Sequence, residues 1–151
     1  MKTMYKAVIS TAFFLLSQCN YASAYEVDEV KKYQWKTEYV VDGDTIAITM
    51  PSLPKELQSM SIRLLGIDTP ETSPSQAKCK EEMVKGEAAK LYLKKWYATT
   101  KVVEYDPAHW DKYGGRIDAV VYFDGVNVNS KMVALGFAKH YDGKAKSSWC
   151  K

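Results

Sequence analysis

Acidic side chains and an arginine cluster in two short segments of this sequence, in a combination that suits chemistry on phosphate esters. Asp44 stands at the start of one strand-like run, and Arg63, Asp68 and Glu71 stand at the end of the next. Carboxylate oxygens are the ligands that hard cations prefer, and a guanidinium group binds phosphate through paired hydrogen bonds. A site that offers both groups is suited to the cleavage of phosphodiesters.

These side chains must be positioned by the β-hairpin that the two runs predict. Residues 38–50 and 59–68 are typical of strands, and the loop between them contains two prolines. With a period of two, Asp44 shares a face with Ile46 and the apolar residues that follow it. A carboxylate at the edge of an apolar face is costly unless it is paired or binds a metal. The alternative is that the preceding residues form a turn, which Asp44 only caps.

Arg63 and Asp68 reach the same site only if the second strand bends or ends between them. They are an odd number of residues apart, so they would face opposite sides of a flat strand. Gly66 is the expected point of the bend, because glycine inside a strand often marks a kink. Pro70 then ends the strand pairing.

The remaining elements predict a small β-barrel with helices packed outside it. Residues 79–97 form one long helix, residues 101–105 and 116–123 form two strands, and a short helix begins at Ser130 and ends at Gly136. The apolar stripe expected on the long helix consists of Val84, Ala88, Ala89, Tyr92, Leu93 and Trp96. The residues of the last strand expected to face the core are Ile117, Ala119, Val121 and Phe123.

Residues 1–24 have the pattern of an export signal. Lys2 and Lys6 precede a short apolar run, and Ala22-Ser23-Ala24 fits a small-residue cleavage site. We therefore expect residues 25–151 to form one exported domain, periplasmic or secreted, with no stable membrane association. An N-terminal membrane anchor and lipid attachment at Cys19 are the alternatives.

Charge and cysteine content narrow the class of protein further. Cleavage would remove two of the 21 basic residues and none of the 18 acidic ones, leaving a nearly neutral chain. Tight binding of nucleic acid by bulk electrostatics is therefore not predicted. Cys79 and Cys150 survive cleavage and suggest a disulfide between the start of the long helix and the tail, with two free buried thiols as the alternative. Neither His109 nor His140 lies in a zinc-binding pattern.

The chain resembles the staphylococcal nuclease, or thermonuclease, family. The matching segments are Val41-Asp42-Gly43-Asp44-Thr45, Arg63-Leu64-Leu65-Gly66-Ile67-Asp68-Thr69-Pro70-Glu71, Asp111-Lys112-Tyr113-Gly114-Gly115-Arg116 and, more weakly, Leu135-Gly136-Phe137-Ala138-Lys139. Their order and spacing also agree with the family, over most of residues 38–141. This resemblance implies an α+β, mainly β fold, a five-stranded OB-type barrel with one long and one or two short flanking helices.

The resemblance also implies a calcium-dependent nuclease that cuts DNA and RNA with little sequence demand and leaves 3′-phosphate ends. Asp44 and Asp68 would bind Ca²⁺ through their carboxylates, together with the backbone carbonyl of Thr69. Glu71 would orient or deprotonate the attacking water. We expect the enzyme to act as a monomer and to prefer single-stranded or frayed substrates.

The cations and aromatic residues of the resemblance complete the expected site. Arg63 and Arg116 would bind the phosphate, and Lys112 and Tyr113 would lie beside a terminal phosphate or a base. The family has Tyr-Gly-Arg where this chain has one extra glycine, so Arg116 reaches the site only if a bulge absorbs the insertion. The base-stacking tyrosines of the family have no clear counterpart here, except that Tyr141 is a candidate.

Two other classes of protein would explain part of this pattern. OB-type barrels commonly bind single strands without cutting them, but such a module does not need the acidic residues. A glycosidase with paired carboxylates would explain Asp44, Asp68 and Glu71, but it would leave the arginines without a role.

Overall fold

A computed structural model describes residues 31–112 and 114–151 of the chain, so the expected signal peptide, Cys19 and Tyr113 lie outside the described residues. The main sheet has the order β1-β2-β3-β6-β5, with β7 paired to the edge of β6. The elements are β1 (Lys36–Asp42), β2 (Thr45–Thr49), the 3₁₀ turn η1 (Lys55–Leu57), β3 (Ser59–Leu64), β4 (Ile67–Asp68), α1 (Lys80–Thr99), β5 (Val103–Trp110), β6 (Arg116–Phe123), β7 (Val126–Asn127), α2 (Val128–Ala134) and β8 (Lys139–His140).

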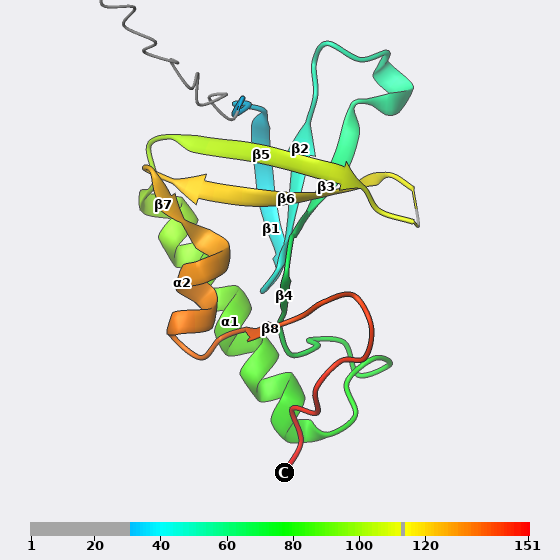
Figure 1. The fold of residues 1–151 in the computed structure, drawn as a ribbon, viewed down its shortest axis with the longest axis vertical. Coiled ribbons are helices and arrows are strands. Elements are labelled where there is room, and N and C mark those ends of the chain that lie inside the picture. The colour runs from blue at the N-terminus through cyan, green and yellow to red at the C-terminus, as the bar shows by residue number, and fades with distance from the viewer. Residues whose placement is uncertain (1–30, 113) are drawn as a thin grey trace, which may run out of the picture.

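The main sheet curls on itself, and both helices lie together beside it (Figure 1). Strands β1, β2 and β3 form an antiparallel meander, whereas β3 pairs with β6 in parallel. The short strands β4 and β8 form a separate pair below the sheet, next to α1. The expected mainly β, OB-type fold with one long and one short helix is therefore confirmed.

The core fills the curl of the sheet and the space between the sheet and the helices. Strand β6 alternates buried and partly buried residues along its whole length, as a period of two requires. The expected inward-facing residues Ile117, Ala119, Val121 and Phe123 are all buried. Each large side chain removed from water contributes about 1.5–3 kcal/mol, so this face fixes β6 on the core, beside its pairing partner β3, the strand that carries Arg63.

The first expected strand is two strands. Residues 38–50 divide into β1 and β2, and a turn at Gly43 and Asp44 reverses the chain. The Asp42 carboxylate accepts a hydrogen bond from the backbone N–H of Asp44 at 3.1 Å, which is the local contact that stabilises such a turn. The prediction of one continuous strand was wrong because the alternation continues across the turn and hides it.

The buried face of α1 also differs from the expected stripe. Ala89 and Leu93 are buried, but Val84 and Ala88 are exposed. Glu82 and Gly86 are buried instead, because backbone loops, rather than the sheet, cover the first half of this helix.

Two smaller boundaries differ from the sequence prediction, and a third agrees with it. The short helix α2 is capped by the side chain of Asn127, which accepts a hydrogen bond from the backbone N–H of Ser130; Ser130 is not the cap. Gly136 follows the helix with a positive φ of 75°, as expected for a helix end. Strand β5 continues to Trp110, five residues beyond its expected end, and lies at an edge of the sheet where Pro107 is tolerated.

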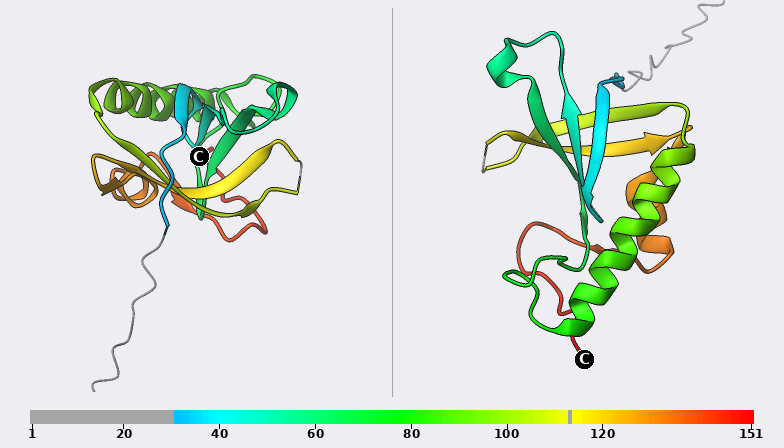
Figure 2. Two further views of the ribbon diagram at one scale, coloured as in Figure 1. Left: turned by 90° about the horizontal axis from the view of Figure 1, so that it is seen from above. Right: turned by 180° about the vertical axis from the view of Figure 1, so that it is seen from behind.

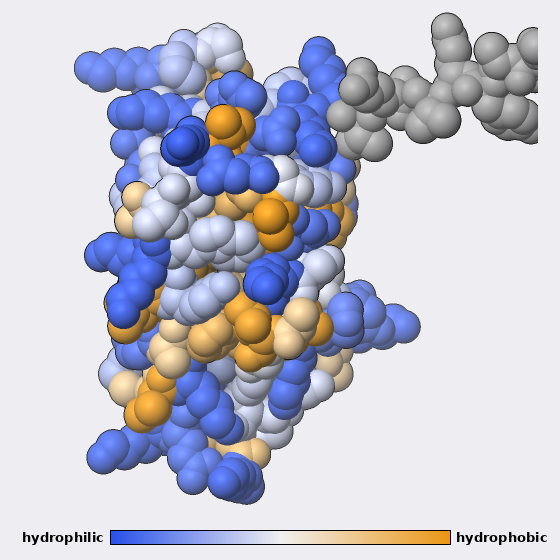
Figure 3. All heavy atoms as spheres, turned by 90° about the vertical axis from the view of Figure 1, so that its left-hand side faces the viewer, coloured by the Kyte–Doolittle hydropathy of each residue, from blue (hydrophilic) through white to orange (hydrophobic). Residues whose placement is uncertain are grey.

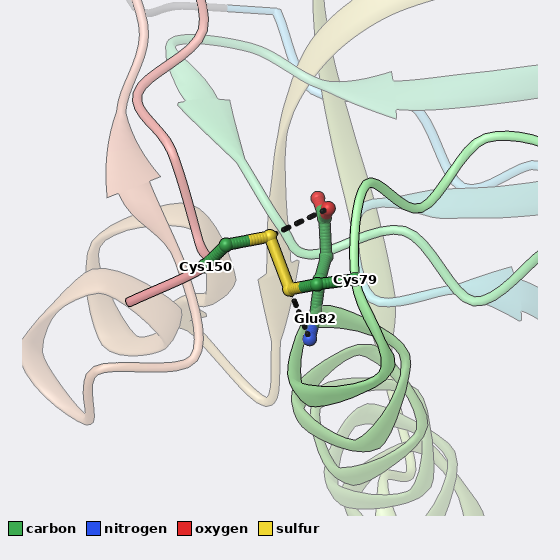
Figure 4. A group of neighbouring side chains, drawn as sticks. All are labelled: Cys79, Glu82 and Cys150. Atoms are coloured by element: carbon green, nitrogen blue, oxygen red, sulfur yellow. Dashed lines mark hydrogen bonds between the residues drawn. A yellow bond between two sulfur atoms is a disulfide. The ribbon is translucent and has the colours of Figure 1, made fainter.

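Cys79 is the residue that caps the start of α1, and it meets Cys150 of the C-terminal segment (Figure 4). Their Cα atoms lie 6.1 Å apart, within the range that a disulfide spans, and the structure joins their sulfur atoms. The expected pairing therefore ties the chain end to the beginning of the long helix.

Candidate active site

The turn between β1 and β2 and the end of β3 bring Asp44, Arg63 and Asp68 together. Thr45 pairs with Arg63 across β2 and β3, so Arg63 lies beside the turn that carries Asp44. One guanidinium nitrogen of Arg63 contacts the Asp44 carboxylate, and the other lies 3.6 Å from Asp68 Oδ1. The exposed fractions of the two aspartates are only 2% and 3%. We call these three residues the buried wall.

Hydrogen bonds fix the orientation of the Asp44 carboxylate. Its Oδ2 accepts from the backbone N–H of Thr69 at 2.9 Å, and its Oδ1 accepts from the Thr45 hydroxyl at 3.3 Å. The backbone carbonyl of Asp44 accepts from the N–H of Leu64 at 2.9 Å, which ties the turn to β3. These contacts explain how a carboxylate is tolerated next to the core.

The predicted bend between Arg63 and Asp68 is present. Strand β3 ends at Leu64, and Gly66 has a φ of 76°, a conformation that favours glycine. The side-chain amide of the buried Asn129 donates to the Leu65 carbonyl at 2.9 Å and holds the bend against α2. This reversal turns Asp68 back toward Arg63.

The loop that follows Asp68 packs closely on α1 at Gly86 and on the β1–β2 turn at Gly43. A Cβ atom at Gly86 would lie 2.7 Å from the carbonyl oxygens of both Pro70 and Glu71. A Cβ atom at Gly43 would lie 2.9 Å from the Thr69 hydroxyl. Glycine at these positions lets the acidic loop approach both the helix and the turn, because any larger side chain would displace it.

Burial sets the electrostatics of this region. Desolvation raises the pKa of Asp42, although Thr45 and Arg63 oppose that effect. Desolvation also lowers the pKa of Arg63, and the charges of Asp42 and Asp68 oppose the change. The guanidinium stays protonated because its ordinary pKa is far above neutrality. A charge pair in such a place interacts more strongly than one in water.

An open cleft of about 1040 Å³ lies over the buried wall. Of the residues predicted for the site, its lining includes Asp44, Arg63, Thr69, Glu71, Lys112, Arg116 and Tyr141. Asp68 is not part of the lining, because other side chains cover it. The structure therefore brings all the described members of the predicted site to one region, and Tyr113 lies outside the described residues.

The extra glycine does not remove Arg116 from the cleft. Gly114 and Gly115 have φ values of 70° and 62°, so both adopt the left-handed conformation and absorb the insertion in the turn between β5 and β6. Arg116 pairs in register with Ser61 of β3 and donates to Asp111 Oδ2 through its Nε at 2.8 Å. It therefore lies on the same cleft as Arg63, on the neighbouring strand of the same sheet face, but with a different acidic partner.

Two residues of the C-terminal segment, to which the sequence analysis assigned no role in the site, contact Asp68 and Glu71. Lys146 Nζ lies 2.9 Å from Asp68 Oδ1 and 2.8 Å from Glu71 Oε1, and the indole N–H of Trp149 donates to Asp68 Oδ2 at 3.2 Å. These two side chains cover Asp68. The predicted link between Cys79 and Cys150 was the one available signal, because it places the neighbours of Cys150 near the start of α1.

Three more residues that line the cleft, to which the sequence analysis assigned no role, lie on β5 and β6 beside the strand that carries Arg63. His109 Nε2 lies 3.0 Å from Asp118 Oδ2, and Asp118 pairs in register with Arg63 between β6 and β3. Trp110 is 62% exposed at the end of β5 and lines the cleft. An exposed aromatic ring on a charged cleft is a surface on which a base can stack.

The acids of this region suit a hard cation. Asp68 Oδ1 is buried, and its neighbours are two cations, Lys146 Nζ at 2.9 Å and Arg63 at 3.6 Å. A buried carboxylate oxygen that faces only cationic groups is suited to a cation ligand. With Asp44 and the Thr69 backbone beside it, the donor set consists of oxygens alone, as calcium prefers.

The sequence of this chain is similar to those of known proteins. A family profile described as "Staphylococcal nuclease homologue" matches residues 61–149. The chain is 34% identical over 112 residues to a thermonuclease of Staphylococcus intermedius and 31% identical over 106 residues to a thermonuclease of Staphylococcus hyicus. These alignments cover 74% and 70% of this chain but 61% and 57% of the relatives, less than two thirds of their length.

A further relative is endonuclease YhcR of Bacillus subtilis (strain 168), 31% identical over 114 residues. That alignment covers 73% of this chain and 9% of the much longer relative. The family profile spans most of β3, both arginines and the C-terminal segment, which line the cleft together with Asp42, Asp44 and Thr45, three residues outside the profile. The chain belongs to the staphylococcal nuclease family.

Proposed function

We propose that the chain is a calcium-dependent nuclease that hydrolyses phosphodiester bonds of DNA and RNA and leaves 3′-phosphate ends. One observation carries this proposal: the Arg63 guanidinium lies between the buried carboxylates of Asp44 and Asp68 at an open cleft. Relatives named thermonuclease and endonuclease support the same reaction class.

In this proposal Asp44, Asp68 and the backbone carbonyl of Thr69 hold the calcium ion. When bound, the ion supplies positive charge that masks the phosphate and stabilises the transition state. A site with few protein ligands is a weak calcium site, which extracellular calcium levels can fill. Export of the protein and the choice of calcium therefore support each other.

The side chains of the chain carry the remaining steps. Arg63 is fixed by its acidic neighbours and donates to phosphate oxygens, more strongly as negative charge builds on them. Arg116 donates from the neighbouring strand β6. Glu71, whose side chain is 28% exposed, accepts a proton from the attacking water. Both arginines act through positive charge and hydrogen bonds, and neither gives up a proton during the reaction.

Substrate binding uses few cations and several aromatic rings. Lys112 and Tyr113 lie beside a terminal phosphate or base in this proposal, and Trp110 and Tyr141 offer ring surfaces at the cleft. Stacking on aromatic rings requires unpaired bases, which supports a preference for single-stranded or frayed substrates. The near-neutral charge of the chain without residues 1–24 fits such local contacts better than a broad basic surface.

We also propose that residues 1–24 are a cleaved signal peptide and that residues 25–151 act as an exported monomer, periplasmic or secreted. Within the described ranges, no helix is long and apolar enough to span a bilayer. An oxidising compartment would preserve a Cys79–Cys150 disulfide. The face in Figure 3 is mostly hydrophilic, although a band of apolar side chains crosses it below the middle.

Digestion of denatured DNA with added Ca²⁺, and in parallel with a calcium chelator, tests the proposal. We expect cleavage only with Ca²⁺, and end-group analysis should find 3′-phosphate and 5′-hydroxyl ends. Full activity in the chelator would reject the calcium mechanism. Retention of single strands without cleavage would instead favour an OB-type binding module.

A further inference from the structure

The C-terminal tail, residues 141–151, lies against the candidate metal site although it is remote from that site in sequence. Figure 2 shows it, in red, running beside the loop after β4 and the start of α1. The tail contains neither a helix nor a strand, so its position depends on individual contacts. One of these contacts reaches Asp68 through the indole of Trp149, which is only 9% exposed.

The two oxygens of the Asp68 carboxylate have different surroundings. Oδ2 accepts the indole N–H of Trp149 at 3.2 Å. Oδ1 faces two cations, Arg63 at 3.6 Å and Lys146 at 2.9 Å. A carboxylate that is held through one oxygen cannot rotate freely. The indole therefore keeps Oδ1 turned toward the side on which cations lie.

Trp149 is itself held on three sides. Its backbone carbonyl accepts from Lys85 Nζ of α1 at 2.8 Å, and Lys139 Nζ of β8 lies 4.2 Å from its ring centroid. The next residue, Cys150, is joined to Cys79, the cap of α1 (Figure 4). The indole is therefore fixed to the same helix on which the acidic loop packs.

We propose that Trp149 is a positioning residue for the metal ligand Asp68, and that the Cys79–Cys150 link holds it in place. This inference rests on the proposed function, because it takes Asp68 as a calcium ligand. Trp149 acts through Asp68 and touches neither ion nor substrate. Groups that hydrogen-bond to metal ligands commonly change metal affinity about 10- to 100-fold when they are removed.

Calcium titration of Trp149→Phe by calorimetry, without substrate, tests the positioning role. We expect calcium binding at least about 10-fold weaker than in wild type, while the thermal unfolding transition stays cooperative. Trp96→Phe is the matched control, since it removes an indole that packs on Phe123, away from Asp68, and it should leave the affinity unchanged. Wild-type affinity in Trp149→Phe would overturn the inference.

The wild-type protein provides a second measurement, which does not depend on whether a variant folds. The indole N–H signal of Trp149, assigned by NMR from its through-space contacts, should shift in step with calcium binding, because the charge on its acceptor changes. A signal that stays fixed while Ca²⁺ binds would overturn the inference. A wild-type chain that binds no Ca²⁺ would instead refute the proposed function, and the inference with it.

The cysteine link is tested by the double variant Cys79→Ser with Cys150→Ser, made in a Lys146→Met background. Without the link the tail could move Lys146 away from Asp68, and the loss of that competing charge would strengthen calcium binding and mask the effect of a displaced Trp149. Serine keeps a helix cap at position 79. We expect weaker calcium binding than in Lys146→Met alone and a displaced Trp149 signal. Unchanged affinity and an unchanged signal would show that the tail holds Trp149 without the link.

Discussion

The cleft has two kinds of charged side chain, and their contrast shows how this site is built. The side chains of the buried wall, Asp44, Arg63 and Asp68, are 3%, 16% and 4% exposed. A second group, which we call the rim, consists of Glu71, Arg116 and Lys146, whose side chains are 28%, 30% and 42% exposed. The same charges therefore occur in two environments, one shielded from water and one in contact with it.

Shielding changes what each charge can do. In the buried wall, every side chain has several partners from different elements, so its position is set before any substrate arrives. At the rim, water screens the ion pairs and the side chains can move. The contrast indicates that the buried wall supplies the fixed electrostatics, whereas the rim supplies contacts that adjust.

The largest expected effect comes from Arg63→Lys. Lysine keeps the positive charge beside Asp44 and Asp68, so the protein should fold, but it lacks the planar fork that binds phosphate. We expect the rate of DNA cleavage to fall by about three orders of magnitude, as for loss of a fixed donor to a transition state. Single-turnover cleavage assays at saturating Ca²⁺ measure it; a near-wild-type rate would contradict the role of the buried wall.

Gly86→Ala should displace the loop that leads from Asp68 of the buried wall to Glu71 of the rim. Alanine normally favours a helix over glycine by about 0.5–1 kcal/mol. Here its Cβ atom would lie 2.7 Å from two backbone carbonyl oxygens, which a rotamer change cannot relieve. We expect the net stability to fall by about 1–3 kcal/mol and the cleavage rate to fall roughly 100-fold.

Chemical denaturation and cleavage assays measure both effects of Gly86→Ala. Ala88→Gly, at an exposed position of α1, is the control for helix propensity alone and should leave the cleavage rate unchanged. If Gly86→Ala proved more stable than wild type, the close approach of the loop to the helix would be refuted.

Arg116→Lys is the rim counterpart of the change at Arg63. Arg116 is more exposed than Arg63, and its N–H donors already contact Asp111. Water screens its charge, so a lysine at this position should replace more of its contribution to phosphate binding than a lysine at position 63 would. We expect roughly a tenfold loss of cleavage rate. The same assays apply; a loss as large as that of Arg63→Lys would contradict the distinction between the buried wall and the rim.

Lys146→Met should have the smallest effect, in the opposite direction. The Lys146 ammonium lies between Asp68 and Glu71 and competes with a cation for them, but it is screened by water. We expect calcium binding to tighten about two- to fivefold in calorimetric titration. Lys144→Met, in the same tail but 85% exposed and paired with Asp142, should change nothing; weaker binding in Lys146→Met would contradict competition.

Local patterns predicted most of the fold and the centre of the site. The second strand of the hairpin, the bend at Gly66 and the buried face of β6 follow from alternation and glycine placement within a few residues. The face of α1 was mispredicted at Val84 because helical periodicity assumes a neighbouring sheet, whereas loop backbone and the tail cover that part of the helix.

The sequence by itself determined that an arginine and two aspartates meet, because a hairpin and one bend bring Asp44, Arg63 and Asp68 together through contacts close in the chain. Only the tertiary structure decided what covers Asp68. Lys146 and Trp149 reach it from the far end of the chain, and nothing in their local sequence records the surface on which an irregular tail packs. Strand alternation is a short-range property, whereas the path of such a tail depends on contacts with α1 and β8 that form only once the chain has folded.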